Sequence, residues 1–259
     1  TFSLGFSGPG EEQWSELPLA RAMAEKWGTE HHQIVLDPKS LLADLTSMAW
    51  NMDEPYGGGL PSWSVFKFLG DHVKVALTGT GGDELFGNYN KFSGLERRVL
   101  PNLFAPRSAA KSERFRQGFM DQNYYCSDED KRNRVFSDDF SALEDTNALL
   151  YGHFSSEKSE AMRNRTTRTD FETQLPEEFL AMTDRFSMAH NVEARTPFLD
   201  NEMIYLASRI PASIRLNQRN YKKILRNAIG DLLPPELIRA PKRGFVIPLK
   251  LWLRDQLRP

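Results

Sequence analysis

This chain of 259 residues contains almost no cysteine. It also lacks a large excess of charge of either sign, and it has no long apolar run. Cys126 is the single cysteine, which excludes an intramolecular disulfide and a metal centre built from several thiolates. The formal net charge of -2 gives no electrostatic case for a nucleic acid or an anionic membrane as partner. No apolar run reaches the length of a membrane span. We therefore expect a globular cytoplasmic protein with one large or two small domains.

The glycine cluster of residues 75–92, VALTGTGGDELFGNYNKF, lacks the spacing of two common nucleotide-binding motifs. A dinucleotide-binding turn, G-x-G-x-x-G, needs a third glycine where Glu84 stands. A Walker loop needs a lysine after its second glycine, and Gly87 is followed by Asn88. The cluster is therefore neither a dinucleotide fingerprint nor a P-loop.

What the cluster does contain is a strand-like run that ends in glycines and then in two carboxylates, Asp83 and Glu84. Glycines allow backbone N–H groups to approach an anion closely. Carboxylates would repel a bare phosphate unless a divalent cation lies between them. The pattern predicts a metal–polyphosphate site at the end of a strand. An ordinary glycine-rich turn that opens a helix capped by Asp83 explains the same residues, and the local sequence leaves both interpretations open.

Strand-like and helix-like segments alternate through the first 80 residues. Asp37 and Pro38 have the residue types of an N-cap and a first helical position, so a helix is expected from there to about residue 51. This alternation predicts an α/β fold with a parallel sheet and helices on both faces, whose ligands bind beyond the carboxyl ends of the strands. The expected strands are 1–6, 31–36 and 73–79, and the other expected helices are 15–27 and 60–71.

The remainder of the chain has a different character. Residues 93–177 are rich in charge and weakly periodic, which predicts an insert of solvated helices and loops. Residues 178–259 form a third, mostly helical region. The first 92 residues are then the nucleotide-binding core. Helices are expected over 177–195, 201–210 and 221–233.

Three separated segments together resemble one family. They are LTGTGGDELFGNY (77–89), DRFSMAHNVEARTPFLD (184–200) and YKKILRNAIGDLLPPELIRAPKRGFVIPL (221–249). In this order they resemble the synthetase domain of glutamine-dependent asparagine synthetase, and MDEP (52–55) is similar to a further loop of that domain. The resemblance covers nearly the whole chain and is weakest over 93–177. It implies a fold like that of the adenine nucleotide α-hydrolases.

The resemblance also implies a reaction, in which ATP is split to AMP and pyrophosphate with Mg²⁺ to drive amide formation. A small-molecule carboxylate, aspartate or another acid, would attack the α-phosphate, and ammonia would capture the acyl-adenylate. The ammonia would come from a glutaminase domain that this chain does not contain. The family's S-G-G-x-D-S pyrophosphate loop and its first strand are expected upstream of Thr1, so we expect no turnover by these 259 residues alone. A homodimer is left open.

By the match to the family, several residues would bind the nucleotide. Leu4 would contact the adenine, and Thr78 and Gly79 would lie beside the ribose and the α-phosphate. Gly81 belongs to the same turn, and Lys222 would reach phosphate oxygens.

The same match implies charged groups for the chemistry. Asp83 corresponds to a carboxylate that binds the metal on the pyrophosphate side, and Lys242, in PKRGF, to a lysine that stabilises charge on the reacting species. Glu193 is a catalytic candidate as well, although a structural role is favoured for it. A structural ion-pair network that borders the site is expected from Asp184, Arg185, Glu193, Arg195 and Asp200.

Thr80 is the main departure from the family. Asparagine synthetases read S-G-E-G where this chain reads Thr78 to Gly81, and their glutamate assists the attack of ammonia. Thr80 occupies this catalytic position without a charge and cannot act as a base near neutral pH. The acid expected shortly after DEP is replaced by the glycines 57–59. A non-aspartate acid such as a sugar acid, closure of a ring with an internal amine, and a non-catalytic binding or assembly role therefore stay open beside asparagine synthesis.

Overall fold

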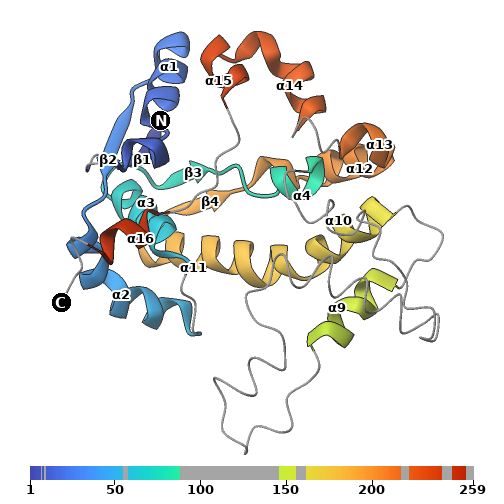
Figure 1. The fold of residues 1–259 in the computed structure, drawn as a ribbon, viewed down its shortest axis with the longest axis horizontal. Coiled ribbons are helices and arrows are strands. Elements are labelled where there is room, and N and C mark those ends of the chain that lie inside the picture. Colours follow the sequence, from blue (N-terminus) through green and yellow to red (C-terminus); the bar gives the residue numbers. More distant parts are fainter. Residues whose placement is uncertain are drawn as a thin grey trace, which may run out of the picture. The chain divides into compact units, whose positions relative to one another are not determined.

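A computed structural model describes residues 1–6, 8, 10–54, 58–87, 146–155, 162–216, 222–240 and 247–254 (Figure 1). These residues belong to two compact units. The first comprises 1–80, 177–197 and 225–259, and the second comprises 81–176 and 198–224. Cys126, Lys242 and most of the predicted insert lie outside the described residues, so the predicted boundaries at 92 and 177 stay predictions.

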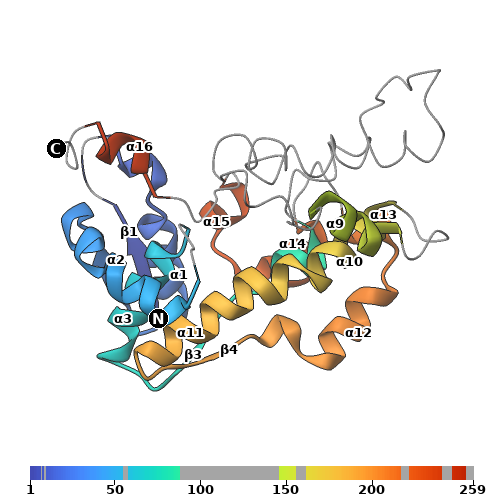
Figure 2. The same cartoon turned by 90° about the horizontal axis from the view of Figure 1, so that it is seen from below.

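Parallel strand pairs form the sheet structure of the first unit. Strand β1 (Phe2–Gly5) pairs with β2 (His32–Val35), and β3 (Val75–Leu77) pairs with β4 (Glu193–Arg195), which lie side by side in Figure 2. Both pairs are parallel, and among the described residues they form two separate two-stranded sheets. The three predicted strands and the α/β class are therefore confirmed.

Strand β4 corrects the expectation of a continuous helix over 177–195. A π-helical turn (Leu175–Leu180) leads into helix α11 (Ala181–Ala189), which ends before a turn at Asn191, whose φ is 57°. Val192 is fully buried, and the chain then runs as the strand Glu193–Arg195. Glu, Ala and Arg all favour helices, so the pairing with β3 overrides local propensity here.

Local signals mark the start of α2 and the end of α1. Helix α2 (Pro38–Met52) starts after Asp37, whose carboxylate accepts a hydrogen bond from the Ser40 N–H at 3.0 Å. Helix α1 ends at Gly28, which adopts the left-handed conformation with φ 60°. The first unit also contains α1 (Leu17–Trp27), α3 (Leu60–Gly70), α15 (Pro235–Arg239) and α16 (Leu249–Trp252).

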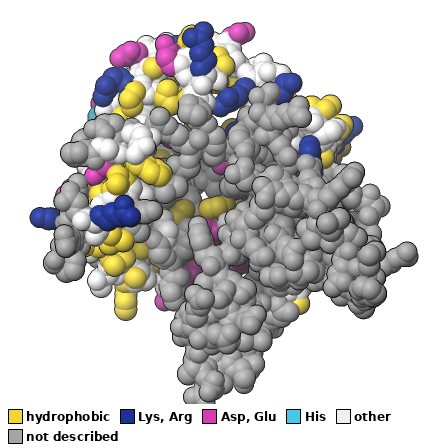
Figure 3. Space-filling view, in the orientation of Figure 1, with side chains coloured by type: hydrophobic (Ala, Val, Ile, Leu, Met, Phe, Trp, Pro, Cys, Tyr) yellow, Lys and Arg dark blue, Asp and Glu magenta, His cyan; other side chains and the backbone are white. Residues whose placement is uncertain are grey.

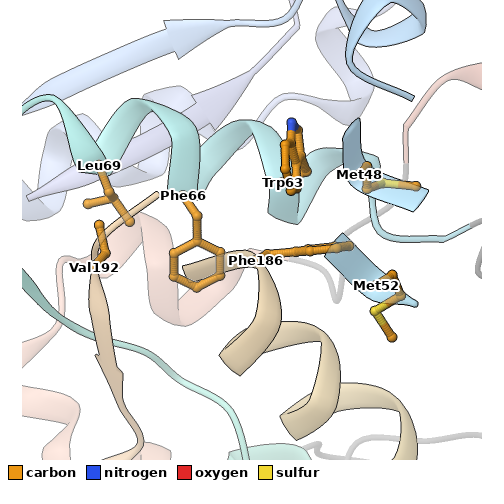
Figure 4. Close-up of a cluster of buried hydrophobic side chains, with 7 residues drawn as sticks. All are labelled: Met48, Met52, Trp63, Phe66, Leu69, Phe186 and Val192. Atoms are coloured by element: carbon orange, nitrogen blue, oxygen red, sulfur yellow. The ribbon is translucent and has the colours of Figure 1, made fainter. Parts of the chain in front are cut away.

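One buried cluster joins the helices of the first unit to its strands (Figure 4). Partly buried Phe2 of β1, Ala76 of β3 and Ala194 of β4 all pack against this cluster, so both strand pairs share one core. The Trp63 ring meets the Phe186 ring edge-on, with 5.4 Å between centroids. The cluster consists of Met48 and Met52 from α2, Trp63, Phe66 and Leu69 from α3, Phe186 from α11, and Val192.

The second unit is helical in its described part. Its elements are α4 (Gly82–Phe86), α9 (Thr146–Ser155), α10 (Met162–Glu172), α12 (Asn201–Arg209) and α13 (Ala212–Arg215), and α14 (Lys223–Ile229) spans the boundary between the units. None of the helices in the described ranges has the length and apolar character that a membrane span needs. On the described part of the face in Figure 3, basic, acidic and apolar side chains are interspersed.

Phe186 provides a direct test of the shared core. Phe186→Ala should lower the free energy of unfolding by about 3–5 kcal/mol, because it removes a fully buried ring and leaves a cavity. Met188→Ala, on the same helix at a side chain that is 58% exposed, should change it by less than about 0.5 kcal/mol. Urea unfolding of both variants measures the difference. Equal losses in the two variants would show that the cluster does not hold the unit together.

Candidate functional site

The end of β3 is held by its partner strand. The Thr78 N–H donates to the Arg195 carbonyl at 2.8 Å, which extends the β3–β4 pairing by one residue. The Thr78 hydroxyl donates to Thr80 Oγ1 at 3.2 Å. Thr78 and Thr80 are therefore fixed at the carboxyl end of a strand, where ligands bind in open α/β sheets.

Gly79 lies between these two threonines and is exposed. Its φ is not positive, and a Cβ built on it would meet no described atom within 4 Å. The described chain therefore does not require glycine here, either for backbone conformation or for space. A missing side chain at an open strand end suits the close approach of an external group, which agrees with the predicted phosphate contact.

Gly81 is explained by packing in the second unit. Its φ is 90°, a conformation that favours glycine, and a Cβ there would overlap the Leu199 side chain. Gly81 is also the N-cap of α4, so the alternative reading of Asp83 as the helix N-cap is wrong. Asp83 lies instead inside the first turn of that helix.

Asp83 and Lys222 form an ion pair, with 2.6 Å between Lys222 Nζ and Asp83 Oδ1. The two side chains are 27% and 31% exposed, respectively, so the pair is partly shielded from water. Lys222 adopts the left-handed conformation with φ 51°. A Cβ on Gly82 would lie 3.5 Å from Lys222 Nζ, so the ammonium rests directly over glycine backbone. The structure thus brings together the predicted phosphate-binding lysine and the predicted metal ligand.

The donor set does not by itself build the predicted magnesium site. In the parts of the chain that the structure describes, no three His, Cys, Asp or Glu side chains gather where they could hold a metal ion. The Asp83 carboxylate is also engaged by an ammonium group. The described structure pairs the Asp83 carboxylate with the Lys222 ammonium, and the binding of magnesium by Asp83 stays a prediction.

Arg215 is a supporting residue that the sequence did not reveal. It is 5% exposed and donates to the Leu85 carbonyl and, at 3.0 Å, to Asn164 Oδ1. Burial lowers the pKa of its guanidinium from the ordinary value. A buried arginine that binds the backbone of α4 fixes the helix that carries Asp83. No local pattern distinguishes it from a surface arginine.

Leu4 lies in the middle of β1, opposite Ile34 of β2. It packs against a second buried cluster, formed by Phe6, Leu36, Leu41 and Trp252. Its role in contacting adenine stays a prediction, as do the nucleotide roles of Thr78, Gly79, Gly81 and Lys222.

The predicted ion-pair network appears as separate contacts. Glu193 and Arg195 pair with each other at 2.9 Å, and both side chains are 60% exposed. Arg185 lies 3.6 Å from Glu54 and also donates to the Met52 carbonyl. Asp200 is the N-cap of α12 and accepts from the Glu202 N–H. An exposed pair such as Glu193–Arg195 contributes little to stability. Its exposure leaves the catalytic candidacy of Glu193 open.

Substitution by alanine should affect the stability of the fold differently at Gly79 and at Gly81. Gly81→Ala should destabilise the fold by roughly 2 kcal/mol or more, because alanine is strained at φ 90° and overlaps Leu199. Gly79→Ala should leave the free energy of unfolding within about 0.5 kcal/mol of wild type. Chemical denaturation separates the two variants. A large loss of stability in Gly79→Ala would show that this glycine is structural.

Comparison with known proteins places the chain in a family. The family model described as asparagine synthase matches residues 1–259. The chain is 28% identical to glutamine-hydrolyzing asparagine synthetase 1 of Bacillus subtilis over 99% of the chain and 44% of that protein. It is 27% identical to asparagine synthetase 3 of the same organism over 88% of the chain and 36% of that protein.

A more distant relative has a different name. Amidase chry2 of Gibberella zeae is 19% identical over 92% of the chain and 42% of its own length. The chain thus spans less than half the length of each of these relatives. Because the family model matches the chain from end to end, the chain belongs to the asparagine synthase family.

Proposed function

We propose that this chain is the synthetase part of an ATP-dependent ligase that forms an amide from a carboxylic acid and ammonia. The observation that carries the proposal is the family match over all 259 residues. The open glycine at the end of β3 supports it, because Gly79 offers bare backbone where a nucleotide phosphate would approach. Ammonia would come from a glutaminase domain in a longer parent protein, and asparagine synthetase 1 of Bacillus subtilis is named as glutamine-hydrolyzing.

The proposed reaction has two steps. A carboxylate oxygen attacks the α-phosphorus of ATP, the bond to the bridging oxygen breaks, and pyrophosphate leaves. Ammonia then attacks the acyl carbon, AMP leaves with that carboxylate oxygen, and the nitrogen loses a proton. Charge develops on the phosphate oxygens in the first step and on the acyl oxygen in the second. The protein therefore needs fixed cations beside both positions.

Lys222 is the fixed cation that the structure supports best. Its ammonium is held by Asp83 at 2.6 Å, so little side-chain freedom is lost when a phosphate oxygen binds it. Lys242 is proposed as the second cation on the basis of the PKRGF match alone, since it lies outside the described residues. Magnesium also stays a proposal, with Asp83 as its candidate ligand, because no three His, Cys, Asp or Glu side chains gather among the described residues to form a metal site.

The identity of the acid is a separate question. Thr80 replaces the glutamate of the S-G-E-G motif. Its side chain carries no charge, and its hydroxyl accepts a hydrogen bond from the Thr78 hydroxyl. An acid other than aspartate is therefore a second candidate. The amidase relative shows that proteins alike over most of this chain are not all named asparagine synthetases.

An assay of the parent protein decides between these functions. It should release AMP when given ATP, ammonia and the correct acid from a panel that contains aspartate, sugar acids and an amine-bearing acid. Release with aspartate alone would contradict the second candidate. No release with any acid would favour a non-catalytic binding or assembly role and contradict the proposal.

Lys242 gives a quantitative prediction for the parent. If Lys242 neutralises charge that develops only in the transition state, Lys242→Ala should slow single-turnover AMP release by roughly 100-fold or more. The affinity for ATP should stay nearly unchanged. Lys242→Arg should restore little of the rate of AMP release, because a planar guanidinium does not replace a compact ammonium. Lys39→Ala, at an exposed position of α2, is the matched control. A wild-type rate for Lys242→Ala would remove the catalytic role.

A further inference from the structure

Helix α1 ends in two side chains that bind a turn far away in the sequence. The Lys26 ammonium donates to the carbonyls of Asp231 and Leu233 at 2.7 and 2.9 Å. The Trp27 indole N–H donates to the carbonyl between them, that of Leu232, at 3.0 Å. One helix end therefore holds three consecutive carbonyls, two of them through charge-assisted hydrogen bonds. We call Lys26 and Trp27 the α1 clamp.

The clamped turn leads directly into helix α15. Pro234, the residue after the turn, is buried and is the N-cap of this helix. Helix α15 has five residues, whereas an isolated helix of fewer than about 12 residues is marginal in water. Its place therefore depends on contacts with the rest of the first unit, where it lies beside α1 (Figure 1). The α1 clamp fixes the chain immediately before this short helix.

The chain leaves α15 beside strand β1. Leu237 of α15 lines the same apolar hollow as Leu4 of β1. Ala240 follows the helix, and Lys242 comes two residues later. The Cα atoms of Ala240 and Lys242 are therefore at most about 7 Å apart, since each trans peptide spans no more than about 3.8 Å. By fixing the start of α15, the clamp limits where Lys242 can lie.

The chain returns to β1 after residues 241–246. Ile247 and Leu4 pack against the same buried cluster, the one that contains Trp252. The Trp252 indole N–H donates to the Glu11 carboxylate at 2.8 Å, and the Glu11 side chain is buried, so this hydrogen bond is shielded from water. The segment 241–246 thus begins and ends beside the strand whose Leu4 is the proposed adenine contact.

We propose that Lys26 and Trp27 are positioning residues for the proposed reaction, and that they act by fixing the start of the segment that carries Lys242. This inference rests on the proposed function, in which Lys242 is the second cation. A charge that stabilises a transition state has to be held in place before the reaction, and a displacement of about 1 Å can cost roughly 100-fold in rate. The clamp itself binds backbone carbonyls and is not proposed to touch the substrate.

Single-turnover kinetics of the parent protein test this role. Lys26→Met removes the donor but keeps an apolar stem, so it should slow AMP release by roughly 10-fold or more at saturating ATP. The affinity for ATP should change by less than about 2-fold, because the lost contact is with the protein's own backbone. Lys26→Arg keeps donors for the carbonyls and should restore most of the rate. Lys39→Met, at an exposed lysine of α2, is the matched control and should release AMP at the wild-type rate.

A double-mutant cycle separates positioning from a general loss of stability. In Lys242→Ala the group that the clamp positions is gone, so adding Lys26→Met should slow AMP release by less than about 2-fold further. A further loss as large as the one in the wild-type background would show that Lys26 acts independently of Lys242, and it would overturn the proposal. A wild-type rate for Lys26→Met alone would overturn it as well.

Amide hydrogen exchange of the parent protein tests the clamp without any activity. The Leu237 N–H donates to the Pro234 carbonyl at 3.0 Å, and it should exchange at least about 5-fold faster in Lys26→Met than in wild type. The Leu36 N–H, which donates to the Gly5 carbonyl, is the internal reference and should be unchanged. Equal exchange of Leu237 in both proteins would overturn the clamp. Absence of AMP release by the wild-type parent would instead contradict the proposed function, so the two fail separately.

Discussion

Burial of the Phe186 cluster is the constraint on which the rest of the first unit depends. Phe186 and Val192 are fully buried against α2 and α3, which brings residues 186–195 back to a strand more than 100 positions earlier. Only then can β4 pair with β3 and hold Thr78 through the Arg195 carbonyl. The strand end that carries Gly79 is thus positioned by hydrophobic packing at a distance from it.

Local signals predicted the elements that they govern. Asp37 and Pro38 marked the start of α2 correctly, because an N-cap and a fixed φ act within a few residues. Strand β4 was missed, because Glu193, Ala194 and Arg195 favour a helix and only pairing with β3 makes them a strand.

At the candidate site, the sequence identified residues more readily than the contacts that those residues make. Asp83 and Lys222 were both singled out, yet their ion pair joins positions 139 apart and no spacing rule reveals it. Gly79 and Gly81 look alike in sequence. The structure separates them, since φ 90° and Leu199 explain Gly81 while nothing described explains Gly79. The role of a single glycine therefore follows from the structure and not from the sequence. The same holds for Arg215, whose burial no local sequence pattern reveals.

The proposed reaction depends on activation of the acid by adenylation. Incubating the parent protein with ATP, ammonia and its acid labelled with oxygen-18 in the carboxylate tests it most directly. Attack on the α-phosphorus transfers one carboxylate oxygen to the leaving nucleotide, so mass spectrometry should find the label in AMP. Label in inorganic phosphate, with ADP as the nucleotide product, would show activation through an acyl phosphate and contradict the account.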